Sequence, residues 1–215
     1  MAASFPETAI STERLLLRPL DDGDTAGLVA MAADEQVQAW TDLSAPFTEA
    51  HARDWIRRIA PTRRADGSGI VFAVTEHLTQ RLVGLADLRA TDWRLRSTEL
   101  GFLTAAWARG EGYAGEAALG VAQWLFEDRG FLRLELRTAA GNIAGQQVAQ
   151  KIGAISEGVL RSAWIVRGEE YPASSPARRS AADDRTDLIL WSLLPEDLEV
   201  PQDDGRAEHR YVLHD

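Results

Sequence analysis

The stretch Glu99-Leu-Gly-Phe-Leu-Thr-Ala-Ala-Trp-Ala-Arg-Gly-Glu-Gly-Tyr-Ala-Gly-Glu-Ala117 decides the fold, because it joins three elements in one run. The alternating side chains of residues 99–103 predict a strand with Glu99 and Leu103 on one face. The glycine-rich segment 109–115 predicts a tight turn. The apolar residues after it recur at helical spacing and predict a helix.

Elements of both kinds are predicted on either side of this run. Strands are predicted at 14–19, 70–75, 82–88, 132–137, 155–166 and 188–194, and helices at 22–33, 48–60 and 144–152. The second and third of these strands are joined by a short polar loop, so we expect an antiparallel hairpin. The strand–turn–helix–strand unit from 99 to 137 predicts a parallel pair. An α/β (α+β) fold follows, with a mixed sheet and helices on both faces.

Composition limits the classes of protein to consider. The chain has 215 residues, of which 45% are apolar and 26% charged, as expected for one globular domain. It has no cysteine, which excludes disulfides, thiolate metal sites and a catalytic cysteine. The first thirty residues contain neither a signal peptide nor a membrane span. We therefore expect a cytoplasmic protein without a membrane partner.

The formal net charge of −10 argues against a nucleic-acid partner. From Pro195 onward, seven acidic residues face only two arginines, so half of this charge lies at the C-terminal end. An acidic run of this kind is more often a solvated tail than a binding site. The four histidines form no metal-like spacing with acids, so no metal site is predicted.

The segment Arg109-Gly-Glu-Gly-Tyr-Ala-Gly115 predicts an anion site, because it joins a strand to the N-terminus of a helix. Glycines allow a tight turn and a close approach of the backbone to a ligand. The first N–H groups of a helix lack partners and carry partial positive charge. Such a turn suits a phosphate or pyrophosphate. The alternative is that the glycines serve the turn alone.

The same glycines also match the dinucleotide fingerprint Gly110-x-Gly112-x-x-Gly115, with Glu135 twenty residues further on. Three features argue against that interpretation. Thr104–Ala108 separates the strand from the turn, about a hundred residues precede the unit, and Glu135 lies within a strand rather than at its end. A Walker A loop is excluded because no Lys-Ser/Thr pair follows.

The segment Arg109-x-x-Gly112-x-Ala114 resembles the motif with which the GNAT acyltransferase superfamily binds the pyrophosphate of coenzyme A. Further segments resemble acetyltransferases of the RimJ/RimL type: Thr12–Pro19, Glu99–Phe102, Gly112–Ala117, Asn142, Lys151–Gly153, Glu157-Gly158, Asp187 and Trp191–Leu194. The resemblance covers residues 11–198. It leaves out an acidic tail, 199–215, and part of the loop 172–187, which looks like an insertion.

This resemblance implies a single acetyltransferase domain at 1–198, with a twisted, mostly antiparallel sheet of about seven strands. It implies an N-acetyltransferase that moves an acetyl group directly from acetyl-CoA to a primary amine, as a monomer or homodimer. The residues that it assigns to the cofactor are Phe102, Leu103, Arg109, Gly110, Gly112, Tyr113, Ala114, Gly115 and Asn142. For Asn142, a helix N-cap without a cofactor contact is the alternative.

Acetylation requires a neutral amine, a polarised carbonyl and a proton for the leaving thiolate. Glu99 is the first candidate for the general base, as the resemblance implies, with a structural or solvated carboxylate as the alternative. Asp87 is the second candidate. The backbone N–H of Leu103 is expected to polarise the carbonyl.

The chain departs from the RimJ/RimL pattern at two positions. Gly145 stands where Asn-x-x-Ser has its serine, and Trp164 stands where some relatives have a catalytic glutamate. These departures motivate an alternative function, a non-catalytic acyl-CoA sensor. If the chain is an enzyme, its acceptor is expected to meet Trp40, Asp87 and Trp164, on a rim with Thr41, Asp42 and the loop 172–187.

Overall fold

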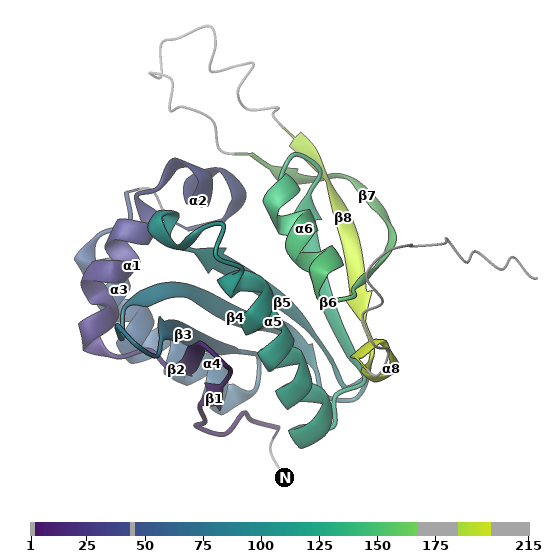
Figure 1. Ribbon diagram of the computed structural model, residues 1–215, viewed down its shortest axis with the longest axis horizontal. Helices are drawn as coiled ribbons and strands as arrows, with labels where there is room; N and C mark the ends of the chain where they lie inside the picture. The colour runs from purple at the N-terminus through teal and green to yellow at the C-terminus, as the bar shows by residue number, and fades with distance from the viewer. Residues whose placement is uncertain (1–2, 44–45, 167–184, 199–215) are drawn as a thin grey trace, which may run out of the picture.

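The computed structural model describes residues 3–43, 46–166 and 185–198. Its strands form one mixed sheet in the order β1-β2-β3-β4-β5-β6-β8-β7 (Figure 1). The strands are β1 (Ile10–Ser11), β2 (Leu15–Pro19), β3 (Ile70–Glu76), β4 (Leu82–Asp92), β5 (Ser97–Thr104), β6 (Arg133–Ala139), β7 (Ile155–Ile165) and β8 (Arg185–Leu193). Neighbouring strands are antiparallel except for β5 and β6, which are parallel.

Helices lie on both faces of the sheet: α5 and α6 lie in front of it in Figure 1, and α3 and α4 lie behind it. The α-helices are α1 (Thr25–Ala32), α2 (Glu35–Trp40), α3 (Glu49–Asp54), α4 (Ala60–Asp66), α5 (Tyr113–Gln123), α6 (Ile143–Lys151) and α8 (Pro195–Leu198). Short turns of other helix types are η1 (Asp22–Asp24), η2 (Trp55–Ile59), η3 (Ala106–Ala108) and η4 (Trp124–Asp128).

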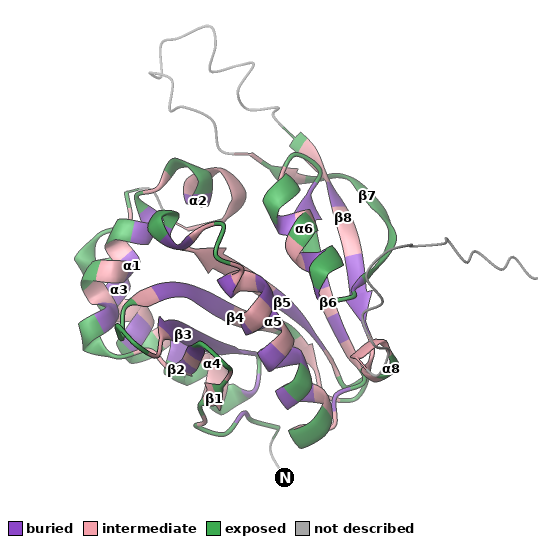
Figure 2. Ribbon diagram, viewed as in Figure 1, coloured by how far each residue is buried: buried purple, intermediate pink, exposed green. Residues whose placement is uncertain are grey.

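The main core lies between the sheet and α5. Alternate residues of the strands point toward this helix, and Leu15, Phe72 and Leu136 are completely buried there. Val121 and Leu125 are their completely buried counterparts from α5 and η4. Burying each such side chain contributes about 1.5–3 kcal/mol. Figure 2 shows the contrast between the buried central strands and the edge strand β7, which is almost wholly exposed.

The structure confirms the predicted architecture, with eight strands rather than about seven. The hairpin is β3–β4, and the parallel pair is β5–β6. The additional strand is β1, whose two residues are too few for a periodic pattern. Residues 185–187 belong to β8 rather than to the predicted loop 172–187; the remainder of that loop and the predicted acidic tail, 199–215, lie outside the described residues.

One helix was missed, and the end of another was predicted wrongly. The helix α2 was not predicted, because its six residues give no clear period. The helix predicted at 48–60 does not end before Pro61 but continues to Asp66. The π-helical turn η2 precedes Pro61, which occupies the first turn of α4, where proline needs no N–H partner.

The strands β5 and β6 separate along their length. They pair only from Ser97 to Glu99, opposite Arg133 to Glu135, although β5 continues to Thr104 and β6 to Ala139. Beyond Glu99 the sheet therefore has an internal gap between two strands whose backbone groups face each other without pairing.

Candidate active site

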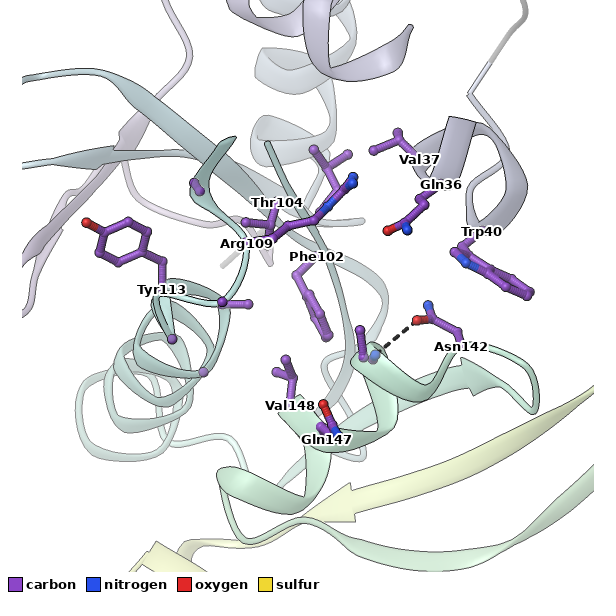
Figure 3. A pocket seen from close by; sticks show the side chains of 18 of the residues that line it. Gln36, Val37, Trp40, Phe102, Thr104, Arg109, Tyr113, Asn142, Gln147 and Val148 are labelled. Atoms are coloured by element: carbon purple, nitrogen blue, oxygen red, sulfur yellow. Dashed lines mark hydrogen bonds between the residues drawn. The ribbon is translucent and has the colours of Figure 1, made fainter. Parts of the chain in front are cut away.

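A cavity of about 330 Å³ opens where β5 and β6 separate, and we call it the gap cavity. Its walls come from α2, the end of β5, the glycine turn with α5, and α6 (Figure 3). The lining residues are Gln36, Val37, Trp40, Thr41, Phe102, Leu103, Thr104, Ala108, Arg109, Gly110, Gly112, Tyr113, Ala114, Gly115, Asn142, Ala144, Gly145, Gln147, Val148 and Lys151. The cavity thus combines apolar side chains with exposed backbone at a helix start.

The glycine turn is shaped for close approach. Gly110 and Gly112 have φ values of +83° and +80°, which favour glycine. Gly112 caps α5 without a side chain, so the first N–H groups of α5 lack intrahelical acceptors. Lys151 adds a positive charge close to the turn. Its Nζ lies 3.3 Å from the position that a Cβ on Gly112 would occupy. The turn, the helix start and the ammonium group together favour an anion.

A polar network fixes the start of α5. The Glu116 carboxylate accepts hydrogen bonds from Thr12 Oγ1 (2.6 Å), from the backbone N–H of Arg14 (2.8 Å) and from Arg14 Nε (2.7 Å). The Tyr113 hydroxyl donates to Glu76 Oε1 at 2.6 Å. These bonds attach the first turn of α5 to the segment between β1 and β2 and to the end of β3, so the glycine turn is held on a rigid support.

Arg109 points toward α2 and not into the turn. Its guanidinium forms a two-pronged ion pair with Asp34, with Nη1 3.3 Å from Oδ2 and Nη2 2.5 Å from Oδ1. Asp34 also caps α2 by accepting from the N–H groups of Gln36 and Val37. The hydrogen bond from Arg109 lowers the pKa of the Asp34 carboxyl below its usual value, although burial opposes this shift. The motif arginine therefore connects the glycine turn to the opposite wall.

Asn142 is the N-cap of α6, the role given above as the alternative to a cofactor contact. It also lines the gap cavity. Its Oδ1 accepts from the N–H of Gly145 at 3.0 Å (Figure 3). Within the described chain, its Nδ2 has no hydrogen-bond partner. A Cβ on Gly145 would lie 3.0 Å from Nδ2, so a serine there would crowd this cap.

Phe102, rather than Leu103, turns its backbone N–H toward the gap. The N–H of Ala105 donates to Val83 O of β4 at 2.8 Å. Groups that face the same neighbouring strand recur every second residue, so the N–H of Leu103 faces β4 as well. The Leu103 carbonyl faces β4 too, because its oxygen would lie 2.4 Å from a Cβ on Gly84 of that strand. The intervening N–H of Phe102 faces the gap.

Glu99 lies on the other face of the sheet and does not line the gap cavity. It is 7% exposed, and arginines occupy both of its oxygens. Oε1 accepts from Arg89 Nε (2.9 Å) and Nη2 (2.7 Å), and Oε2 lies 3.3 Å from Arg137 Nε. Both oxygens of this carboxylate therefore face an arginine in the structure.

Asp87 lines a second cavity, of about 550 Å³, which we call the Asp87 groove. The groove lies between α3, η2, α4 and the end of β4. Its charged and aromatic residues are Asp42, Phe47, His51, Asp54, Trp55, Arg63, Asp87 and Arg89. A third cavity contains Trp164 with Thr41, Asp42 and Arg185. Asp42 lines both of these cavities, so they are neighbours.

The gap cavity brings together all nine residues that the sequence assigns to a cofactor. Trp40, predicted on the acceptor rim, lines this cavity as well. Sequence reasoning missed Gln36, Val37 and Lys151. The first two lie on the unpredicted α2, whereas Lys151 belongs to a segment that carries the family resemblance and could have been chosen as a cation at the end of α6.

Comparisons with known proteins agree with this geometry. A family model described as "Acetyltransferase (GNAT) domain" matches residues 14–155. The chain is 25% identical over 162 residues to the uncharacterized N-acetyltransferase YoaA of Bacillus subtilis (strain 168). The matched region covers 75% of this chain and 91% of YoaA.

Two solved structures share the fold. Mycobacterium smegmatis RimJ in complex with CoA-disulfide has a TM-score of 0.73 at 19% identity, over 91% of this chain and 90% of RimJ. The ribosomal-protein-S5-alanine acetyltransferase from Vibrio fischeri has a TM-score of 0.68 at 16% identity, over 89% of this chain and 98% of that enzyme. In the part of the chain that the structure describes, no helix is long and apolar enough to cross a membrane.

Proposed function

This chain belongs to the GNAT acetyltransferase family and is an acyl-CoA-dependent N-acetyltransferase, and we propose that it acetylates a primary amine by direct transfer from acetyl-CoA. The observation that carries this proposal is the gap cavity, which opens beside an unpaired strand backbone and a glycine turn. We further propose that residues 1–198 form the catalytic domain. The amine is a peptide or protein N-terminus or a small molecule.

The residues of the gap cavity fit acetyl-CoA. An anionic pyrophosphate would find the N–H groups at the start of α5, which lack intrahelical acceptors, and the ammonium group of Lys151. The Asn142 amide nitrogen supplies a further hydrogen-bond donor. When bound, acetyl-CoA supplies a thioester whose carbonyl carbon is open to attack by an amine.

The chain's own groups would assist this reaction in three ways. The backbone N–H of Phe102 faces the gap and can polarise a carbonyl oxygen. The cavity walls orient the donor and exclude water, because Trp40 and Phe102 contribute apolar surface. A carboxylate on the other face of the sheet accepts a proton from the amine.

We place the acceptor where Thr41, Asp42 and Trp164 come together, next to the Asp87 groove. Trp164 offers a flat apolar surface in place of a carboxylate. This arrangement favours an amine that carries an apolar or aromatic neighbour. Trp164→Ala should raise KM for such an amine and leave the affinity for CoA unchanged.

A thiol-release assay tests the proposed function. The protein is incubated with acetyl-CoA and a panel of N-terminal peptides, aromatic monoamines, polyamines and aminoglycosides, and free thiol is measured with DTNB. Acetylation of at least one amine supports the proposal. Tight binding of CoA by calorimetry without turnover on any of these amines would favour the acyl-CoA sensor instead.

A further inference from the structure

We infer that Asp87, rather than Glu99, takes the proton of the acceptor amine, and that the amine reaches it through the Asp87 groove. This inference rests on the proposed function. It assigns a residue of β4, outside the gap cavity, to the proton transfer that acetylation requires.

The groove lies on the face of the sheet opposite α5, and Asp87 and Arg89 bring it to β4, the strand next to β5. Asp87 pairs across β4 and β5 with Gly101, and such opposite residues lie about 5 Å apart at their Cα atoms with side chains on the same face. Gly101 has no side chain, and the Arg89 guanidinium covers it, since its carbon would lie 3.3 Å from a Cβ on Gly101. The next residue along β5 is Phe102, whose N–H faces the gap. Asp87 therefore stands one strand away from the point where a carbonyl would be polarised.

The Asp87 carboxylate keeps one oxygen that no described residue contacts by a hydrogen bond or ion pair. Its buried Oδ1 lies 2.8 Å from Arg63 Nη2, which leaves Oδ2 for another donor. Glu99, by contrast, accepts two hydrogen bonds on one oxygen and contacts Arg137 with the other. An amine could approach Glu99 only by displacing an arginine.

The charges around the groove also suit a base. Burial raises the pKa of the Asp87 carboxyl above its usual value; Arg63 and Arg89 oppose this shift, and the charge of Asp42 supports it. The other titratable groups of the groove are His51 and Asp54, both from α3. A carboxylate with a raised pKa is a stronger base than an ordinary aspartate.

The proton balance is simple. An ammonium group in the groove gives one proton to Asp87, directly or through one water, and becomes a neutral amine. A C–N bond then forms at the thioester carbonyl and the C–S bond breaks, with its electron pair leaving on sulfur. The second proton of the nitrogen neutralises the departing thiolate, and Asp87 releases its proton to solvent.

The test compares Asp87→Asn with Asp92→Asn across pH 5.5 to 9.5. Asp92 lies on the same strand, outside the groove, and its Oδ1 accepts from the N–H of Leu95 at 2.8 Å. We expect Asp87→Asn to lower kcat/KM about 100-fold at pH 7. The loss should shrink as the pH passes the pKa of the amine, and the control should keep the parent's profile. Overlaying profiles for parent and Asp87→Asn would overturn the inference.

A second measurement uses the parent protein alone, so it depends neither on turnover nor on the folding of a variant. The Asp87 carboxyl carbon is titrated by NMR in the parent protein without CoA. A midpoint above that of an ordinary aspartate supports the inference, whereas an ordinary or lowered midpoint overturns it. If the parent acetylates none of the amines tested, the proposed function fails. If the parent acetylates an amine and Asp87→Asn leaves the pH profile unchanged, only this inference fails.

Discussion

Arg137 reaches across the gap between β5 and β6 to Glu99: its Nε lies 3.3 Å from Glu99 Oε2. Glu99 is the last residue of β5 that pairs with β6, and Arg137 lies two residues beyond the last pairing residue of β6. The ion pair therefore joins the two strands just where their backbones part. Arg89 holds the second oxygen of Glu99 from β4, so that three neighbouring strands meet at one carboxylate.

Glu99→Gln should weaken this junction. The substitution leaves two arginines without their buried counter-charge and should lower the free energy of unfolding by about 1–3 kcal/mol. Because Glu99 lies outside the gap cavity, the pH dependence of kcat/KM should keep its shape. Urea unfolding and a pH–rate profile measure the two effects.

Glu135→Gln is the matched control. Glu135 lies on the same face and pairs with Arg133 and Arg137, but its side chain is 25% exposed against 8% for Glu99. Glu135→Gln should therefore lower the free energy of unfolding by less than Glu99→Gln does. A stable Glu99→Gln protein whose activity loss is greatest at low pH would instead identify Glu99 as the base.

Asp34→Asn should loosen the wall that α2 contributes to the gap cavity. The variant loses the ion pair with Arg109 and weakens the cap of α2, for an expected loss of about 1–2 kcal/mol at neutral pH. Because the folded-state pKa of Asp34 is lowered, its contribution is present above the unfolded pKa. It disappears as the pH falls through the folded value.

Urea unfolding of parent and Asp34→Asn between pH 7 and pH 2 checks this sign. The difference between the two proteins should close in acid. A difference that stays constant with pH would mean that the charge of Asp34 is not what stabilises α2.

The glycine turn and its helix were predictable because their chemistry is local: positive φ values and a helix start require glycine and a particular spacing. The orientation of Phe102 and Leu103 was not. Which backbone N–H faces the gap depends on the register of β5 against β4, and no residue of β5 encodes that register by itself. The ion pairs of Glu99 were hidden for the same reason, since Arg89 and Arg137 come from strands far apart in sequence.

Glu157→Gln should weaken the attachment of the edge strand β7. Its carboxylate pairs with Arg133 of β6, with 2.8 Å from Oε1 to Nη1, and this arginine lowers the pKa of Glu157 to about 2. Stability from the pair is therefore present above the usual glutamate pKa and is lost as the pH falls toward 2. Solvent screening should limit the loss at pH 7 to about 0.5–1 kcal/mol, and added salt should reduce it further. Thermal unfolding at low and high salt measures it; an unchanged loss in high salt would contradict an electrostatic origin.

Gly112→Ala should separate the ligand role of the glycine turn from its role in the fold. Gly112 has φ +80°, so a Cβ costs about 1–2 kcal/mol of backbone strain, and that Cβ would lie 3.3 Å from Lys151 Nζ. Gly130→Ala is the matched control, because Gly130 has φ +67° with nothing within 4 Å of its Cβ position and does not line the gap cavity. Both variants should lose similar stability in urea.

Only Gly112→Ala should weaken CoA binding, at least tenfold as measured by calorimetry. Its methyl group would stand where the backbone of the turn meets the ligand and would displace the ammonium group of Lys151. Equal CoA affinities in the two variants would mean that the turn only shapes the chain, and the assignment of the pyrophosphate to this turn would be withdrawn.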